Sequence, residues 1–291
     1  MFKRILFLIL SLVFSYKAFA ENSCKLISRL DKDLWLVDST GKIIQRLSYD
    51  GVYKTAATWS PDGKYIAYAP APFSNFGEKA IFIIDNSGQE LSKIIVEPKT
   101  DDPNLQYIRW VSKLNWEKTN ILWSDSAVGK NGGFIDIWKL DSNLRASREK
   151  RIGALGGSCE LSPSEQYVVC IYEILKNEKF LPILMLYDTS KKRFQEDEFF
   201  SDDNPRTIEL KQIEHVDKIR FTSDNANVII IGADKKYKFN MLDNKLSEIK
   251  ELPPDVKVKS IPKMVKIKKD EKELSVEVFD MYCGQNSTVP K

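Results

Sequence analysis

The chain has 291 residues, 43% of them hydrophobic and 29% charged, and its length suits a single all-β domain. Its formal charge of +3 resides in the first 20 residues, which hold three of the 44 basic residues and no acidic one, so 41 basic residues remain against 41 acidic ones. This balance leaves no global basic field, so we expect no nucleic-acid partner. The single histidine excludes histidine-rich metal sites, and we expect neither a metal nor a cofactor.

Residues 1–20 follow the pattern of a secretory signal peptide. Two basic residues begin it, an apolar run covers 5–14, and Ala-Phe-Ala at 18–20 provides a cleavage site. The apolar run is too short to span a bilayer. We therefore expect residues 21–291 to form a periplasmic or secreted domain that is not an integral membrane protein, with an uncleaved anchor as the alternative.

A strand–turn–strand pattern recurs along the chain. Its clearest copy is Trp-Ser-Pro-Asp-Gly-Lys-Tyr-Ile-Ala-Tyr at 59–68, where Pro61 fixes φ and Gly63 can adopt a positive φ. Weaker copies lie at 116–123, 161–169 and 221–229. Recurrence at this spacing indicates stacked or radial modules.

A second signal is an apolar run that ends in an aspartate and opens a turn, because an aspartate side chain caps the backbone two residues on. The aspartates are Asp38, Asp85, Asp141, Asp188 and Asp243. Their mean spacing is roughly 51 residues. Each module is then a four-stranded meander, with strands a to d, and such modules form the blades of a β-propeller.

The pattern at 59–68 resembles the WD40-like repeat of TolB-type propellers, which also occurs in the propellers of prolyl oligopeptidase relatives. The resemblance covers about 48–250 and lacks the N-terminal α/β domain of TolB, so it implies a propeller-only relative. It also implies partners among periplasmic or peptidoglycan-associated lipoproteins, although no partner-binding residue of that family can be matched here.

The propeller should have five blades, with the ring closed by both ends of the chain. Strand a of the first blade would fall inside the signal peptide, so we expect 274–279 to replace it and pair with 24–29. The blades are expected at 48–97, 104–152, 154–200 and 209–252, with the first one split. A sixth blade that includes 256–268 is the alternative.

Four cysteines in an exported chain predict two disulfides. Cys159 and Cys170 flank a predicted a–b turn, and Cys24 and Cys283 lie near the two ends of the mature chain, where a bond would lock the closing blade. Four free thiols are the alternative.

The connections predict one binding face. The a–b and c–d turns share one face and are short, whereas the b–c and d–a loops share the other face and are long, as binding loops often are. Aromatic contact candidates on these loops are Phe73, Phe76, Phe180, Phe199 and Phe200. Packing of these side chains beneath their own loops is the alternative.

The stretch from Lys257 to Lys272 holds seven lysines in an alternating pattern. It predicts protection of a sheet edge, or contact with anionic envelope polymers or lipid head groups.

Catalytic signatures are weak. His215 is a lone histidine, no Gly-x-Ser-x-Gly motif occurs, and the chain ends before a hydrolase domain could follow. Acidic pairs at 101–102 and 202–203 are expected to be solvated. We expect a non-catalytic propeller that binds an envelope protein; the alternative is a lyase or hydrolase of a sugar polymer that uses Asp125 or Asp136 near the central channel.

Overall fold

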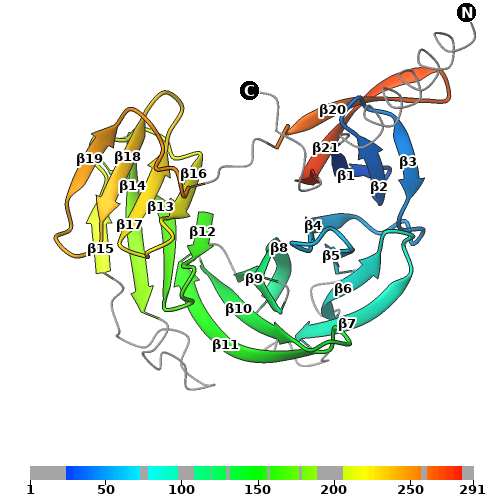
Figure 1. The fold of residues 1–291 in the computed structure, drawn as a ribbon, viewed down its shortest axis with the longest axis horizontal. Coiled ribbons are helices and arrows are strands. Elements are labelled where there is room, and N and C mark those ends of the chain that lie inside the picture. Colours follow the sequence, from blue (N-terminus) through cyan, green and yellow to red (C-terminus); the bar gives the residue numbers. More distant parts are fainter. Residues whose placement is uncertain are drawn as a thin grey trace, which may run out of the picture.

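The computed structural model describes residues 24–72, 78–97, 108–118, 120–128, 132–155, 158–176, 179–188, 206–256 and 261–283. These residues form strands and turns and no helix. Figure 1 shows five antiparallel sheets around a common centre, with β4, β8 and β12 near the middle and β7 and β11 outside. The prediction of a five-bladed β-propeller is confirmed.

Four sheets are continuous in sequence and run in the order a to d. The second sheet consists of β4 (Lys54–Trp59), β5 (Tyr65–Pro70), β6 (Lys79–Asp85) and β7 (Glu90–Glu97). The third consists of β8 (Ile108–Lys118), β9 (Ile121–Val128), β10 (Gly132–Leu140) and β11 (Ala146–Leu155). The fourth consists of β12 (Ser158–Leu161), β13 (Tyr167–Lys176), β14 (Lys179–Asp188) and β15 (Arg206–Glu209). The fifth consists of β16 (Lys218–Phe221), β17 (Asn227–Ile231), β18 (Lys236–Asn240) and β19 (Leu246–Ile249).

The first sheet joins both ends of the chain. Its order is β20 (Met264–Lys269), β21 (Lys272–Tyr282), β1 (Lys25–Leu30), β2 (Asp33–Asp38) and β3 (Ile43–Arg46). β21 pairs with β1 as expected, and Cys24–Cys283 links the ends of these two strands. β20 adds a fifth strand to this sheet, so this segment does not begin a sixth blade. The second predicted disulfide, Cys159–Cys170, joins directly opposed residues of β12 and β13.

Three of the a–b turns share a hydroxyl cap that the sequence patterns did not identify. The side chains of Ser60, Ser162 and Thr222 each accept a hydrogen bond from the backbone N–H five residues on, at 2.9, 2.9 and 3.0 Å. The residue three positions after each cap has a positive φ: Gly63, Glu165 and Asn225, at 68°, 63° and 60°. The copies at 161–169 and 221–229 therefore fold like the clearest one, at a small conformational cost for Glu165.

Three of the predicted aspartate turns form as expected. Asp38, Asp85 and Asp141 each accept hydrogen bonds from the backbone N–H groups two and four residues on. In the β18–β19 turn Asp243 also caps the backbone two residues on as predicted, because its Oδ1 accepts from the N–H of Lys245 at 3.0 Å. Asn240 adds a second cap to this turn, since its Oδ1 accepts from the N–H of Leu242 at 2.9 Å. The expected short turn after Asp188 is wrong, since residues 189–205 connect β14 to β15.

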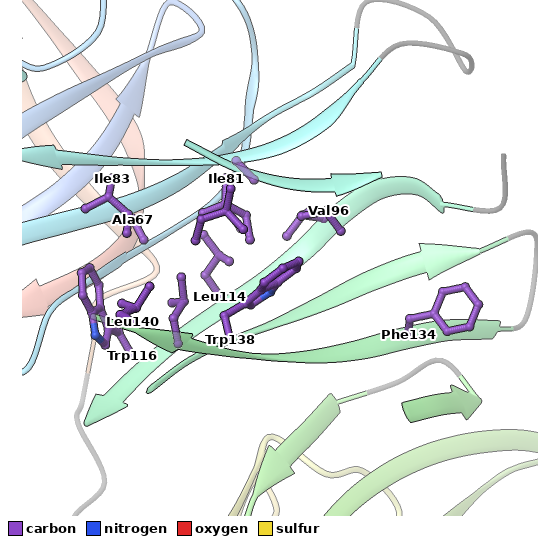
Figure 2. Packing of buried hydrophobic residues seen from close by; sticks show 14 residues of the cluster. Ala67, Ile81, Ile83, Val96, Leu114, Trp116, Phe134, Trp138 and Leu140 are labelled. Carbon is purple, nitrogen blue, oxygen red and sulfur yellow. The ribbon is translucent and has the colours of Figure 1, made fainter. Parts of the chain in front are cut away.

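Apolar clusters join neighbouring sheets at four interfaces. Figure 2 shows the cluster between the second and third sheets, where Ile81 and Ile83 of β6 lie opposite Leu114 of β8 and Trp138 of β10. Similar clusters join the first sheet to the second, the third to the fourth, and the fourth to the fifth. The remaining cluster draws on the five strands of the first sheet and on the flanking residues Cys24, Ile261 and Cys283. Among the described residues, therefore, no apolar cluster joins the fifth sheet to the first.

Gly63 shows how the closing strand constrains the clearest a–b turn. A Cβ at Gly63 would lie 2.3 Å from the ring of Tyr282, whose hydroxyl donates to Asp62 O at 3.1 Å. Gly51 has a similar φ, 63° against 68°, but a Cβ there would meet nothing within 4 Å.

We expect Gly63→Ala to lower the free energy of unfolding by about 2–3 kcal/mol, and Gly51→Ala by only about 1 kcal/mol, the cost of the backbone conformation alone. Urea denaturation of both variants measures the difference. Equal losses would show that the contact with Tyr282 adds nothing.

Candidate functional site

The described part of the b–c/d–a face centres on the β3–β4 connection, residues 47–53. It is a d–a connection and lies beside the b–c connection of the second sheet, because Ala71 N donates to Tyr53 O at 2.6 Å. The β1–β2 turn, a b–c connection, brings Asp33 beneath the same segment.

A buried ionic network holds this connection in place. Asp33 is 2% exposed and Lys54 is fully buried, and the two charges lie 3.9 Å apart. Asp33 accepts from Arg46, from Ser48 Oγ at 3.0 Å and from Gly51 N at 3.2 Å. Lys54 Nζ donates to Asp50 and, at 2.6 Å, to Val52 O. Both ends of the connection are therefore anchored by charge-assisted bonds in a dry environment.

The network also sets the ionisation of Asp33. Burial opposes ionisation, but the hydrogen bonds from Arg46, Ser48 and Gly51 outweigh it and hold the pKa of Asp33 below its usual value. Asp33 is therefore a carboxylate that keeps its charge at neutral pH.

Beside this network lies a set of aromatic and arginine side chains, here called the tyrosine–arginine patch, of which the two tyrosines are exposed and the others half-buried: Arg29, Trp35, Arg46, Tyr49 and Tyr53. Tyr49 is 72% exposed and Tyr53 is 46% exposed. The Arg46 guanidinium lies 4.6 Å from the Tyr49 ring centroid and 5.6 Å from that of Trp35, and the Arg29 guanidinium lies 3.8 Å from that of Tyr53. Cation–π contacts at these distances restrict the tyrosines before any ligand arrives.

Most of the predicted contact phenylalanines lie outside the residues that the structure describes. Phe73, Phe76, Phe199 and Phe200 lie outside the described residues, and Phe180 lies in β14 with its side chain outside them. The expectation that Phe199 and Phe200 follow strand d is wrong, because strand d of that sheet is β15 and residues 189–205 join strand c to strand d. Binding by any of the five remains a prediction.

The side chains of the two candidate catalytic aspartates do not meet in one pocket, because Asp125 and Asp136 lie in neighbouring residue pairs of β9 and β10 and so on opposite faces of the sheet. Asp136 is fully buried, and Arg151 holds it through two bonds of 2.7 and 2.8 Å, with Arg148 3.7 Å away. Burial raises the pKa of Asp125 to about 6, against the attraction of Lys113. Lys113 Nζ in turn donates to Cys159 O at 2.7 Å.

His215 is an exposed residue between carboxylates. Its Nδ1 lies 3.4 Å from Glu173 and its Nε2 lies 3.6 Å from Asp217. The acidic pairs at 101–102 and 202–203 lie outside the described residues. The part of the chain that the structure describes holds no group of three potential metal ligands and no helix that could cross a bilayer.

The lysine-rich stretch supplies an edge strand, β20, at one end of the first sheet. Lys266 pairs with Glu273 at 2.7 Å and Lys269 with Asp31 at 2.6 Å, while Lys257 and Lys259 lie outside the described residues. The edge position fits the expected protection of a sheet edge. Contact with anionic polymers or lipids remains a prediction.

The sequence patterns missed the tyrosine–arginine patch. The 47–53 connection is too short to stand out as a binding loop, and Arg29 and Trp35 lie in strands β1 and β2. The one available signal was local: Tyr49 and Tyr53 sit in a polar connection, where aromatic residues have no core to fill.

No family model and no curated protein matches the chain. Among solved structures it resembles a chain of the mitotic checkpoint complex (TM-score 0.46, 12% identity, 77% of this chain and 61% of that one). It also resembles a putative 6-phosphogluconolactonase from Bacteroides uniformis (TM-score 0.42, 11% identity, 79% and 67%) and TolB from Acinetobacter baumannii (TM-score 0.39, 12% identity, 91% and 64%). The chain thus spans 61% to 67% of the length of these structures. The specific relation to the TolB repeat remains a resemblance.

Proposed function

We propose that the chain is an exported, non-catalytic β-propeller that binds a protein partner in the cell envelope through its b–c/d–a face. The observation that carries this proposal is the tyrosine–arginine patch on that face. Tyrosine, tryptophan and arginine are the residues most enriched among those that dominate binding energies at protein interfaces.

The rigidity of the patch supports a binding role. Tyr49 and Tyr53 stay exposed while their connection is fixed by buried charges from Asp33 and Lys54. A pre-formed surface loses less conformational entropy on binding, so more of the contact energy appears as affinity.

An enzymatic role is less well supported. Both carboxylates that a sugar-polymer lyase or hydrolase would use are buried, with Asp125 8% and Asp136 0% exposed, and Asp136 is fully engaged by Arg151. A general acid or base must reach the substrate. We therefore propose no catalytic activity.

Export is supported by two features of the chain. Residues 1–20 have the pattern of a secretory signal, and Cys24–Cys283 and Cys159–Cys170 are disulfides, which persist in oxidising compartments. A periplasmic location would place the patch among envelope proteins.

Alanine substitutions in the patch test the proposal. With a partner isolated by affinity capture from the envelope fraction, we expect Tyr49→Ala and Tyr53→Ala each to weaken binding by about tenfold or more in biolayer interferometry. The matched control is Leu242→Ala, because Leu242 is 87% exposed in a c–d turn on the opposite face. A partner whose affinity falls only with Leu242→Ala would overturn the proposed face.

A further inference from the structure

A groove lies beside the tyrosine–arginine patch, against the inner strands of the first sheet. Its volume is about 660 Å³, and its lining includes Arg29, Asp31, Lys263, Met264, Glu277 and Val278. Arg29 belongs to both the groove and the patch. The groove is within the size range of small-ligand and short-peptide sites.

The groove exists because β20 adds a fifth strand to the first sheet. β21 packs beside β4 of the second sheet, where Asp280 accepts hydrogen bonds from Thr58 Oγ1 at 3.1 Å and from Trp59 N at 3.0 Å. β20 lies beyond β21, where the second sheet has no further strand to cover it. Met264 at the start of β20 is consequently 51% exposed.

Both carboxylates of the lining are paired with a cation: Glu277 with Arg29, and Asp31 with Lys269, which lies outside the lining, at 2.6 Å. With Lys269 counted, the groove and its ion-pair partners hold three cations against two anions, and Lys263 is the cation outside these two pairs. It lies within electrostatic reach of Lys218, whose pKa is lowered by burial and then by repulsion from Arg220, Lys263 and Lys113. An anionic group would therefore be attracted to this end of the groove.

We propose that this groove binds a short acidic segment of the partner protein that also carries apolar side chains. The anionic groups would lie near Lys263, and the apolar ones would cover Met264. An anionic polymer without apolar groups would leave that methionine in water and gain nothing from its burial. This inference rests on the proposed function and names the chemistry that the face recognises.

Peptide selection tests the groove directly. A phage library of random dodecapeptides is selected on the full, disulfide-bonded chain, and enriched peptides are measured by fluorescence anisotropy. We expect them to combine acidic and apolar residues. Lys263→Glu should raise Kd by about tenfold or more and Met264→Ser by about threefold. The matched control, Lys268→Glu, changes an exposed lysine of the same strand outside the lining and should leave Kd within about twofold.

Several results would overturn the inference. One is the absence of any enriched peptide, and another is unchanged affinity in Lys263→Glu. Displacement by polyglutamate or polyphosphate as strong as by the enriched peptide would reassign the groove to anionic polymers. Peptides that require Tyr49 and Tyr53 but not Lys263 would overturn the groove while leaving the proposed function standing.

Discussion

Replacing Cys24 and Cys283 together by serine is expected to destabilise the protein more than any other change of similar size. The bond spans 259 residues of sequence, against 11 for Cys159–Cys170. In the chain-entropy model, the stabilisation grows with the loop that the bond closes, to about 5–6 kcal/mol for the long loop and about 3 kcal/mol for the short one. The long bond also holds β21 against β1, the pairing that unites the two ends of the chain.

The matched control is the double replacement of Cys159 and Cys170 by serine. Guanidinium denaturation of the two double variants and the wild-type chain, all without reductant, gives the comparison. We expect the Cys24 and Cys283 variant to lose about 2 kcal/mol more than the control. Equal losses would mean that the disulfide between the chain ends stabilises the propeller no more than the local Cys159–Cys170 disulfide does.

Removal of the Asp33 charge is expected to have the second-largest effect. Asp33→Asn keeps the shape of the side chain but leaves the buried Lys54 ammonium and Arg46 without their shared carboxylate. Loss of one partner from a buried ionic pair costs about 3–5 kcal/mol. The 47–53 connection should loosen as well, and with it the patch that it displays.

The effect should depend on pH in a defined direction. The pKa of Asp33 is depressed in the folded state, so its stabilisation is fully present above the unfolded value of about 3.9 and is lost as pH falls through the lower folded value. Urea denaturation at pH 7 and at pH 3 should therefore show a smaller difference between wild type and variant at the lower pH.

Asp31→Asn supplies the control, because Asp31 lies two positions before Asp33 and its carboxylate is exposed, pairing only with Lys269 among the ion pairs of the described residues. An exposed pair is worth about 0–1 kcal/mol, so this variant should stay near wild type. A loss in Asp33→Asn no larger than in Asp31→Asn would contradict the role assigned to the buried network.

Much of the fold was predictable because the signals that set it are local. Pro61 and Gly63 at one turn, and Asp38, Asp85 and Asp141 at others, mark reversals that a few neighbouring residues decide. Local signals do not show how far along the chain the next strand of a sheet lies. The c–d connection of the fourth sheet was mispredicted for this reason, because β14 ends at Asp188 and β15 begins only at Arg206.

The candidate site was much less predictable, because it depends on which connections become neighbours. Arg29 lies in β1 and Tyr53 in the connection that leads into β4, and they touch only because the first and second sheets pack together. The strand character of β20 was visible in its alternating lysines, but its pairing with β21 inside the first sheet was not.

The sequence alone therefore determined the repeated four-stranded module, the number of blades, the closing pair of strands and both disulfides, since each follows from turn chemistry, alternation or the count of cysteines. Only the tertiary structure brought together the residues of the proposed binding surface. The patch and the groove arise from contacts between segments distant in sequence. Those contacts also exclude water from Asp33 and Lys54, and their charge-assisted hydrogen bonds are stronger in that environment than in water.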